Sequence, residues 1–318
     1  MTLVKHILDV IDLLDNPKVN GDNIREFFRD KGLDKYMFIN VEHVSGDKGS
    51  TDFIKIVIPG SSGKSRGGNA PTLGVIGRLG GISARPSIRG LVSDADGAIV
   101  ALAVAYRLAD MASRGDALTG DVIVTTHVTP NAIVTPHKPA PLISSPVNIF
   151  ELLRREVDPQ MDGVLSVDAT KANLVVKGSG FAITPTVKDG WILKVSEDLI
   201  NIYMWVTGHS PIIVPITLQD VLPFSTPIYH INSIVQPWLY THAPVVGIAT
   251  ITESVVPGSA TGVTNIVSLD EAARFIIEVA KGFAEGKVKL YDEDEWNTIM
   301  KIHGSIREIL IRGSPVNF

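Results

Sequence analysis

The sequence predicts an α/β protein with a mixed, mainly parallel β-sheet and helices on both faces. Helix-like and strand-like segments alternate along the 318 residues, which is the pattern of sheet proteins with helical connections. The run 121–126 is apolar throughout, as is typical of a parallel strand buried on both faces. Hydrophobic residues make up 45% of the chain, and we find neither a repeat nor a linker. We therefore expect a single domain over residues 1–318, with N-terminal helices in 1–35 packed on the sheet.

The elements follow from the period of the apolar residues and from Gly, Pro and capping residues at their ends. The expected helices are 2–15, 22–31, 97–113, 148–157, 197–208, 268–282 and 293–311. The expected strands are 36–44, 52–58, 72–76, 121–126, a run ending at Asp168, the hairpin 181–187 with 191–195, and 243–251. Ser268 and Glu271 have the spacing of a capping box that opens a helix. The proline-rich segment 130–146 is expected to be a long loop.

Composition excludes several classes of function. The net charge of -5 gives no basic surface for nucleic acid, and the absence of cysteine excludes disulfides, thiolate metal sites and cysteine nucleophiles. No apolar run reaches the roughly 20 residues that span a membrane, so we expect a cytoplasmic protein without a membrane partner. The apolar composition also fits a homo-oligomer.

A glycine-rich loop invites a phosphate-binding interpretation. Gly63-Lys64-Ser65 follows a predicted strand, but the phosphate-loop signature requires a glycine where Ile58 stands. We therefore expect a surface loop and no nucleotide cofactor.

Acidic residues stand at the ends of two predicted strands, where open α/β sheets usually bind ligands. Asp94 and Asp96 precede the helix 97–113, and Asp168 ends a later strand. Asp94 or Asp96 could instead cap the helix, and Asp168 could bind backbone amides in a turn. Two carboxylates at neighbouring strand ends also suit a divalent metal.

Histidines and further polar residues follow other predicted strands. His127 closes the strand 121–126 and His137 lies in the loop after it; each could be a hydrogen-bonded loop residue or a metal ligand. With the acidic residues they would form an oxygen and nitrogen site for zinc or manganese. The polar stretch 217–265 adds Asp220, His230 and Glu253 as candidate contacts to a ligand.

A set of short motifs is similar to a known family. The motifs are Pro71-Thr-Leu-Gly74, Gly77-Arg-Leu-Gly-Gly81, Ser93-Asp-Ala-Asp-Gly-Ala98, Thr126-His127, Ser166-Val-Asp-Ala-Thr-Lys171, Thr217-Leu-Gln-Asp220 and Pro257-Gly-Ser-Ala-Thr-Gly262. Together they resemble the prokaryotic family called domain of unknown function 1177. A more distant resemblance is to the co-catalytic zinc aminopeptidases, which implies their α/β fold. That family's glutamate pair and late histidine have no counterpart here, and its early His-x-Asp falls near Arg78.

These observations predict a metal-dependent hydrolase acting on a small amide or peptide-like substrate. Asp96, Asp168 and His127 would hold one divalent ion, either zinc or manganese, and His127 or Glu253 would serve in catalysis. Substrate contacts would come from Arg78, Asp94, His137, Asp220 and His230. The alternative is a catalytically inactive ligand-binding or regulatory protein on the same fold.

Overall fold

The computed structural model describes residues 2–78, 80–136, 141–224, 233–257 and 264–312. The helices are α1 (Leu3–Leu14), α2 (Gly21–Asp30), α3 (Asp96–Ser113), α4 (Ile149–Glu156), α5 (Glu197–Thr207), α6 (Leu218–Val221), α7 (Ile266–Ala284), α8 (Glu293–His303) and α9 (Arg307–Leu310), with the 3-10 segments η1 (Lys64–Arg66), η2 (Ser93–Ala95) and η3 (Ser233–Tyr240). The strands are β1 (Phe38–Gly46), β2 (Gly49–Ile58), β3 (Leu73–Gly77), β4 (Val122–Val128), β5 (Ile133–Thr135), β6 (Leu142–Ser144), β7 (Gly163–Ala169), β8 (Phe181–Ile183), β9 (Val187–Lys188), β10 (Trp191–Ile192) and β11 (Val245–Thr250).

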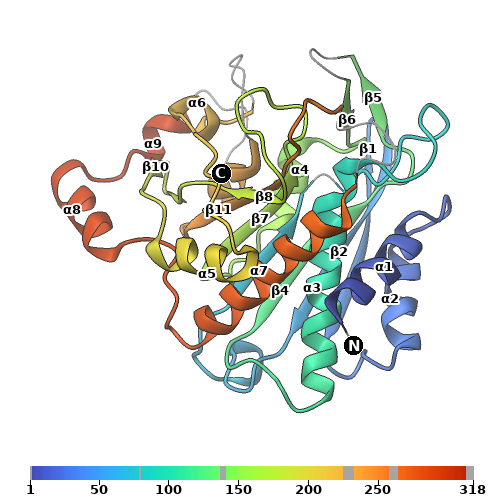
Figure 1. Ribbon diagram of the computed structural model, residues 1–318, viewed down its shortest axis with the longest axis horizontal. Coiled ribbons are helices and arrows are strands. Elements are labelled where there is room, and N and C mark those ends of the chain that lie inside the picture. Colours follow the sequence, from blue (N-terminus) through green and yellow to red (C-terminus); the bar gives the residue numbers. More distant parts are fainter. Residues whose placement is uncertain (1, 79, 137–140, 225–232, 258–263, 313–318) are drawn as a thin grey trace.

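The main sheet of the described chain has a parallel centre and antiparallel flanks, which confirms the predicted fold class (Figure 1). Its strand order is β1-β2-β4-β3-β7-β11-β9-β10, and β8 also pairs with β11. Neighbours within β4-β3-β7-β11 run parallel, whereas β2 pairs antiparallel with both β1 and β4. All the parallel strands therefore end at the same edge of the sheet.

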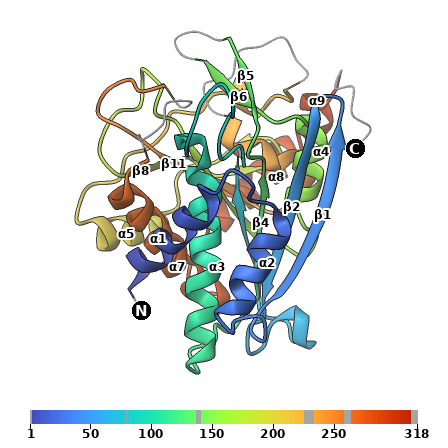
Figure 2. The ribbon, with the colours of Figure 1, turned by 90° about the vertical axis from the view of Figure 1, so that its right-hand side faces the viewer.

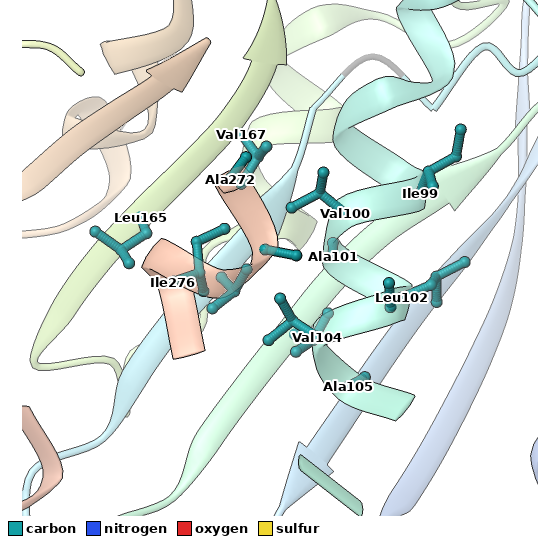
Figure 3. Close-up of a cluster of buried hydrophobic side chains, with 14 of the residues drawn as sticks. Ile99, Val100, Ala101, Leu102, Val104, Ala105, Leu165, Val167, Ala272 and Ile276 are labelled. Carbon is teal, nitrogen blue, oxygen red and sulfur yellow. The ribbon is translucent and has the colours of Figure 1, made fainter. Parts of the chain in front are cut away.

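One face of the sheet is covered by α3 and α7, which pack on each other and on the central strands, and α1 packs on these two helices. Side chains from α3 and α7 interdigitate with Leu165 and Val167 of β7, as Figure 3 shows. Helix α3 is buried on nearly every side because it lies between the sheet, α1 and α7, as its uniformly apolar sequence predicts. Helix α2 packs on the β1–β2 pair, and in Figure 2 it lies beside these long strands.

Two glycines allow α3 to approach the strand ends very closely. A Cβ atom on Gly97 would lie 2.5 Å from the carbonyl oxygen of Val167 and 2.6 Å from that of Arg78. A Cβ on Gly77 would lie 2.6 Å from the carbonyl oxygen of Gly97. Any side chain at these positions would push the first turn of α3 away from β3 and β7.

The opposite face is covered by η3, with α4 and α6 packed beside it. Ile76, Ile123 and Val164 point to this side and contact the apolar cluster around the buried Trp238. Because side chains alternate along a strand, Arg78, His127 and Asp168 face this same side: each lies an even number of residues after one of these three apolar residues. They lie near the end of α4.

The structure differs from the sequence prediction in three local features. Within the segment expected to be a loop, β5 and β6 form a two-stranded hairpin. Helix α7 begins at Ile266 with Asn265 as its N-cap, so Ser268 lies inside the first turn instead of capping it. The last predicted helix ends at His303, where Gly304 adopts a positive φ of 70°, and α9 follows separately.

The glycine-rich loop is held by one carboxylate. Asp121 accepts hydrogen bonds from the backbone N–H groups of Gly60 (2.8 Å) and Ser65 (2.7 Å) and from the Ser65 hydroxyl (2.8 Å). These donors would face phosphate in a nucleotide-binding loop, and here they are satisfied within the protein. Among the described residues, no helix is both long and apolar enough to cross a membrane.

Candidate functional site

The candidate site lies at the edge of the sheet where the parallel strands end. Arg78 follows β3, and its backbone N–H donates to the carbonyl of Val167 on β7 (2.8 Å). Asp168 is the next residue of β7, and His127 lies near the end of β4 on the other side of β3. The sheet register therefore brings Arg78, His127 and Asp168 to three neighbouring strand ends, as the sequence predicts.

Glu156, the last residue of α4, joins Arg78 to His127. The Arg78 Nη1 atom donates to Glu156 Oε2 at 2.7 Å, and Glu156 Oε1 lies 3.6 Å from His127 Nδ1. Burial raises the pKa of Glu156, but Arg78 and His127 outweigh this effect and hold the pKa below its usual value. The His127 ring also stacks on Phe53, with 5.3 Å between the ring centroids. These contacts leave Glu156 charged and fixed.

Asp94 and Asp168 are carboxyl groups with strongly perturbed acidity. Burial raises the pKa of Asp168 to about 7; Arg78 and the Ala169 N–H (2.6 Å) oppose this rise, and the charges of Asp94 and Glu156 add to it. Burial likewise raises the pKa of Asp94 to about 7, with a further contribution from the charge of Asp96. Lys171 and the backbone N–H of Ile143, in the β5–β6 hairpin, oppose the rise. Both carboxyls therefore titrate near neutral pH.

Asp96 is held in a separate, fully buried ion pair. Lys171 Nζ lies 2.6 Å from Asp96 Oδ2, and both side chains are 0% exposed. The hydroxyls of Thr250 and Thr264 donate to the two carboxylate oxygens of Asp96 at 2.7 and 3.0 Å. These bonds lie on the α3 side of the sheet, because Thr250 of β11 faces the same side as Val246 and Ile248, which belong to the core under α3. Asp96 therefore links α3 to β11 and to the segment before α7.

Helix capping does not account for the paired acids. The N-cap of α3 is Ala95, and no side chain makes the capping hydrogen bond there. The N-cap of η2 is Val92, again without a side-chain bond. Asp96 in the first turn still interacts favourably with the helix dipole.

Several predicted ligand contacts lie apart from this network. Asp220 is fully buried and closes a capping box at α6, accepting from the Thr217 N–H (2.7 Å) and hydroxyl (3.0 Å). Glu253 is exposed, three residues beyond the end of β11. His137 and His230 lie outside the described residues.

The predicted metal ligands do not form one donor set in the described chain. The oxygens of Asp96 are bonded to Lys171 and two threonines, and the Nδ1 atom of His127 faces Glu156. Within the described residues, no group of three or more His, Asp or Glu side chains is arranged to hold a metal ion. Within the part of the chain that the structure describes, Asp96, Asp168 and His127 therefore do not fit a shared zinc or manganese site.

Glu156 and Lys171 are the residues that sequence reasoning missed. Glu156 lies in a short amphipathic helix beside Arg154 and Arg155, where a charged residue is expected to face solvent. Lys171 appears in the motif Ser166-Val-Asp-Ala-Thr-Lys171, but no spacing connects it to Asp96. The one signal in the sequence that could have pointed to Lys171 is its position three residues after Asp168, which ends a predicted strand.

The arrangement suits proton transfer. Asp94 and Asp168 retain 9% and 6% exposure, whereas Arg78, Asp96, His127, Glu156 and Lys171 are at 1% or less. Asp94 and Asp168 are therefore the least buried members of this group. A carboxyl that titrates near neutral pH can donate or accept a proton during catalysis.

Comparison with a leucine aminopeptidase agrees with this fold. A tomato leucine aminopeptidase mutant superimposes with a TM-score of 0.52 at 10% identity, covering 86% of this chain. The chain spans 61% of the length of that aminopeptidase. A glutaminyl cyclase from an Acidobacteriales bacterium gives a TM-score of 0.47 at 12% identity, with 90% of this chain and 94% of the cyclase covered. At such identities the likeness to the aminopeptidase shows the fold alone.

Sequence comparison places the chain in a family. No protein with a curated description matches it. The profile described as "Protein of unknown function (DUF1177)" matches residues 42–313, which is most of the chain. The protein therefore belongs to the DUF1177 family.

Proposed function

We propose that the protein is a hydrolase of a small amide or peptide-like substrate, with Asp94 and Asp168 as its acid and base. The observation that carries this proposal is a pair of buried carboxyls whose pKa values burial raises to about 7: Asp168 near the end of β7 and Asp94 in η2. The aminopeptidase-like fold supports it, because ligands of open α/β sheets bind at this edge.

The reaction uses both protonation states of these carboxyls. Because burial raises the pKa of each group to about 7, the ionised and the protonated form are both populated near neutral pH. The ionised carboxylate accepts a proton from water as the water oxygen attacks the amide carbon. The protonated carboxyl donates to the nitrogen as the C–N bond breaks. One water is consumed, and an acid and an amine are released.

The experiment is an assay of purified protein on aminoacyl anilides, dipeptides and simple amides from pH 5 to 9. We expect turnover that falls roughly 100- to 10,000-fold in Asp94→Asn and in Asp168→Asn, the range for loss of general acid–base catalysis. Asp158→Asn is the matched control, because this nearby carboxylate is bonded to Lys55. Absence of turnover in the wild-type protein, or undiminished activity in both aspartate variants, would refute the proposal.

The alternative that hydrolysis depends on a bound metal ion is tested with the same purified protein. Metal content is measured after treatment with a chelator and after incubation with zinc or manganese. We expect no stoichiometric ion whose binding depends on Asp168, because the predicted co-ligands Asp96 and His127 are engaged elsewhere. Stoichiometric binding that Asp96→Asn and Asp168→Asn both abolish would overturn the assignment of proton transfer to the carboxyl pair. Peptide binding without turnover would instead support the alternative of a ligand-binding protein.

A further inference from the structure

We propose that two copies of this chain pair through the free edge of β1, so that the main sheet continues across a two-fold axis. In the described chain β1 is the outermost strand and pairs with β2 alone, and Figure 2 shows it along one side of the molecule. A long unpaired edge is a template for a further strand. The nine residues of β1 contain no proline, lysine or bulge that would protect this edge.

The register of the β1–β2 hairpin determines which backbone groups face outward. Gly46 lies directly opposite Gly49 across a two-residue turn, so these two residues form a hydrogen-bonded pair. Hydrogen-bonded and non-hydrogen-bonded pairs then alternate along the two strands. The N–H and C=O groups that point away from β2 belong to every second residue: Ile39, Val41, His43 and Ser45. Among the described residues, none of these four makes a backbone hydrogen bond outside the β1–β2 pair. The edge can therefore accept a complete antiparallel strand.

The side chains of β1 favour one register for pairing with a second copy. A two-fold axis makes the strands antiparallel and sets each residue opposite the one that lies equally far beyond the centre. Full overlap, centred on Glu42, places this carboxylate against its own copy, and like charges directly opposite are unfavourable. Centring on Asn40 sets the apolar Phe38 against the partner's Glu42. Centring on Val41 sets Asn40 against the partner's Glu42 and Phe38 against the partner's Val44, so we assign this register.

Phe38 explains why a second copy fits this edge better than an unrelated strand. Its side chain is 64% exposed in the single chain. The Val44 that it meets in the partner belongs to an apolar cluster with Phe53, Val147 and Leu152. Because side chains alternate along a strand, Phe38 and Val44 face the same side of the sheet. Symmetry repeats this contact, so each copy supplies both the exposed ring and the cluster that covers it.

The test is sedimentation equilibrium of the full chain over a range of concentrations. We expect the wild-type protein to form a reversible dimer. Asn40→Glu places two carboxylates opposite each other at two symmetric positions, which should raise the dissociation constant about 2- to 30-fold. Asn40→Lys should lower the constant, because it places a cation opposite the partner's Glu42. The matched control is Asn297→Glu on the exposed side of α8, which makes the same change of charge away from β1 and should leave the constant unaltered.

Two further measurements locate the interface. The outward amides of Ile39, Val41 and His43 should exchange their hydrogens quickly in dilute protein and slowly in concentrated protein. Phe38→Ser should weaken the dimer without lowering the unfolding midpoint of the dilute protein, because the ring is exposed in the single chain. A wild-type protein that stays monomeric overturns the inference and leaves the edge to a strand of another protein. A dimer that is equally stable in Asn40→Glu, Asn40→Lys and Phe38→Ser also overturns it, because its interface then lies elsewhere.

Discussion

Replacing Lys171 by methionine removes the cation of the buried pair while nearly keeping the volume of the side chain. Asp96 would then stay inside the protein, where the hydroxyls of Thr250 and Thr264 donate to its carboxylate at 2.7 and 3.0 Å. Breaking one side of a buried ion pair costs about 3–5 kcal/mol. Because the two threonines continue to stabilise the carboxylate, we expect a loss of about 3 kcal/mol in the free energy of unfolding.

The assay is urea unfolding at pH 5 and pH 8, followed by tryptophan fluorescence. Burial already raises the pKa of Asp96, and without the ammonium its carboxyl takes up a proton more readily. The loss of stability should therefore be larger at pH 8 than at pH 5. The matched control is Lys194→Met, which breaks an exposed pair with Asp292 and should leave the unfolding midpoint unchanged.

A double variant completes the test. Asp96→Asn together with Lys171→Met leaves no unpaired charge, so it should be more stable than either single variant, since their effects are coupled. A loss of less than about 1 kcal/mol in Lys171→Met at pH 8 would refute the reasoning, because so small an effect is typical of exposed pairs.

Three further predictions concern other parts of the fold. Burial raises the pKa of Asp168 from 3.8 to about 7, so as pH rises this carboxyl ionises in the unfolded chain before it does in the folded protein, and wild-type stability should fall over this interval. Urea denaturation of Asp168→Asn should therefore depend less on pH. Identical curves for the two proteins would contradict the shift. Gly97→Val should leave no soluble protein, because its Cβ would meet two backbone oxygens at 2.5 and 2.6 Å, whereas Ser113→Val at the exposed end of the same helix should stay soluble. Asp121→Asn should make the loop 60–68 sensitive to trypsin in limited proteolysis, since the amide offers donors where Ser65 also donates; unchanged resistance would show that other contacts hold the loop.

The sequence could predict the edge of the sheet at which the candidate site lies. Asp168 follows an apolar run that forms β7, and the ends of parallel strands meet at one edge. Asp94 also follows an apolar run, but it lies in the 3-10 segment η2 and not at the end of a strand. The strand-end reasoning also located His127, whereas Arg78 was implied by the resemblance to the zinc aminopeptidases. Local pattern therefore identifies which residues stand at a strand end.

The sequence could not predict which charges pair with each other. Asp94 and Asp96 are indistinguishable in the motif, yet Asp94 bonds to the backbone of Ile143, whereas Asp96 bonds with Lys171 on the α3 side. Glu156 reaches Arg78 across 78 residues of chain. Such pairings depend on the three-dimensional register of the sheet and helices. The spacing of charged residues along one helix does not show which distant residue each of them pairs with.

The position of β3 between β4 and β7 has a consequence for folding during synthesis. β3 comprises residues 73–77, but one of its two partners is formed only by residues 163–169. A ribosome-bound chain that ends before β7 can pair β3 on one side only, and closing such a long loop delays the remaining contacts. Asp94 would then be made well before the strand that carries Asp168. The two carboxyls come to lie in the same folded protein only when β7 docks, so the site forms late in folding as a product of long-range assembly.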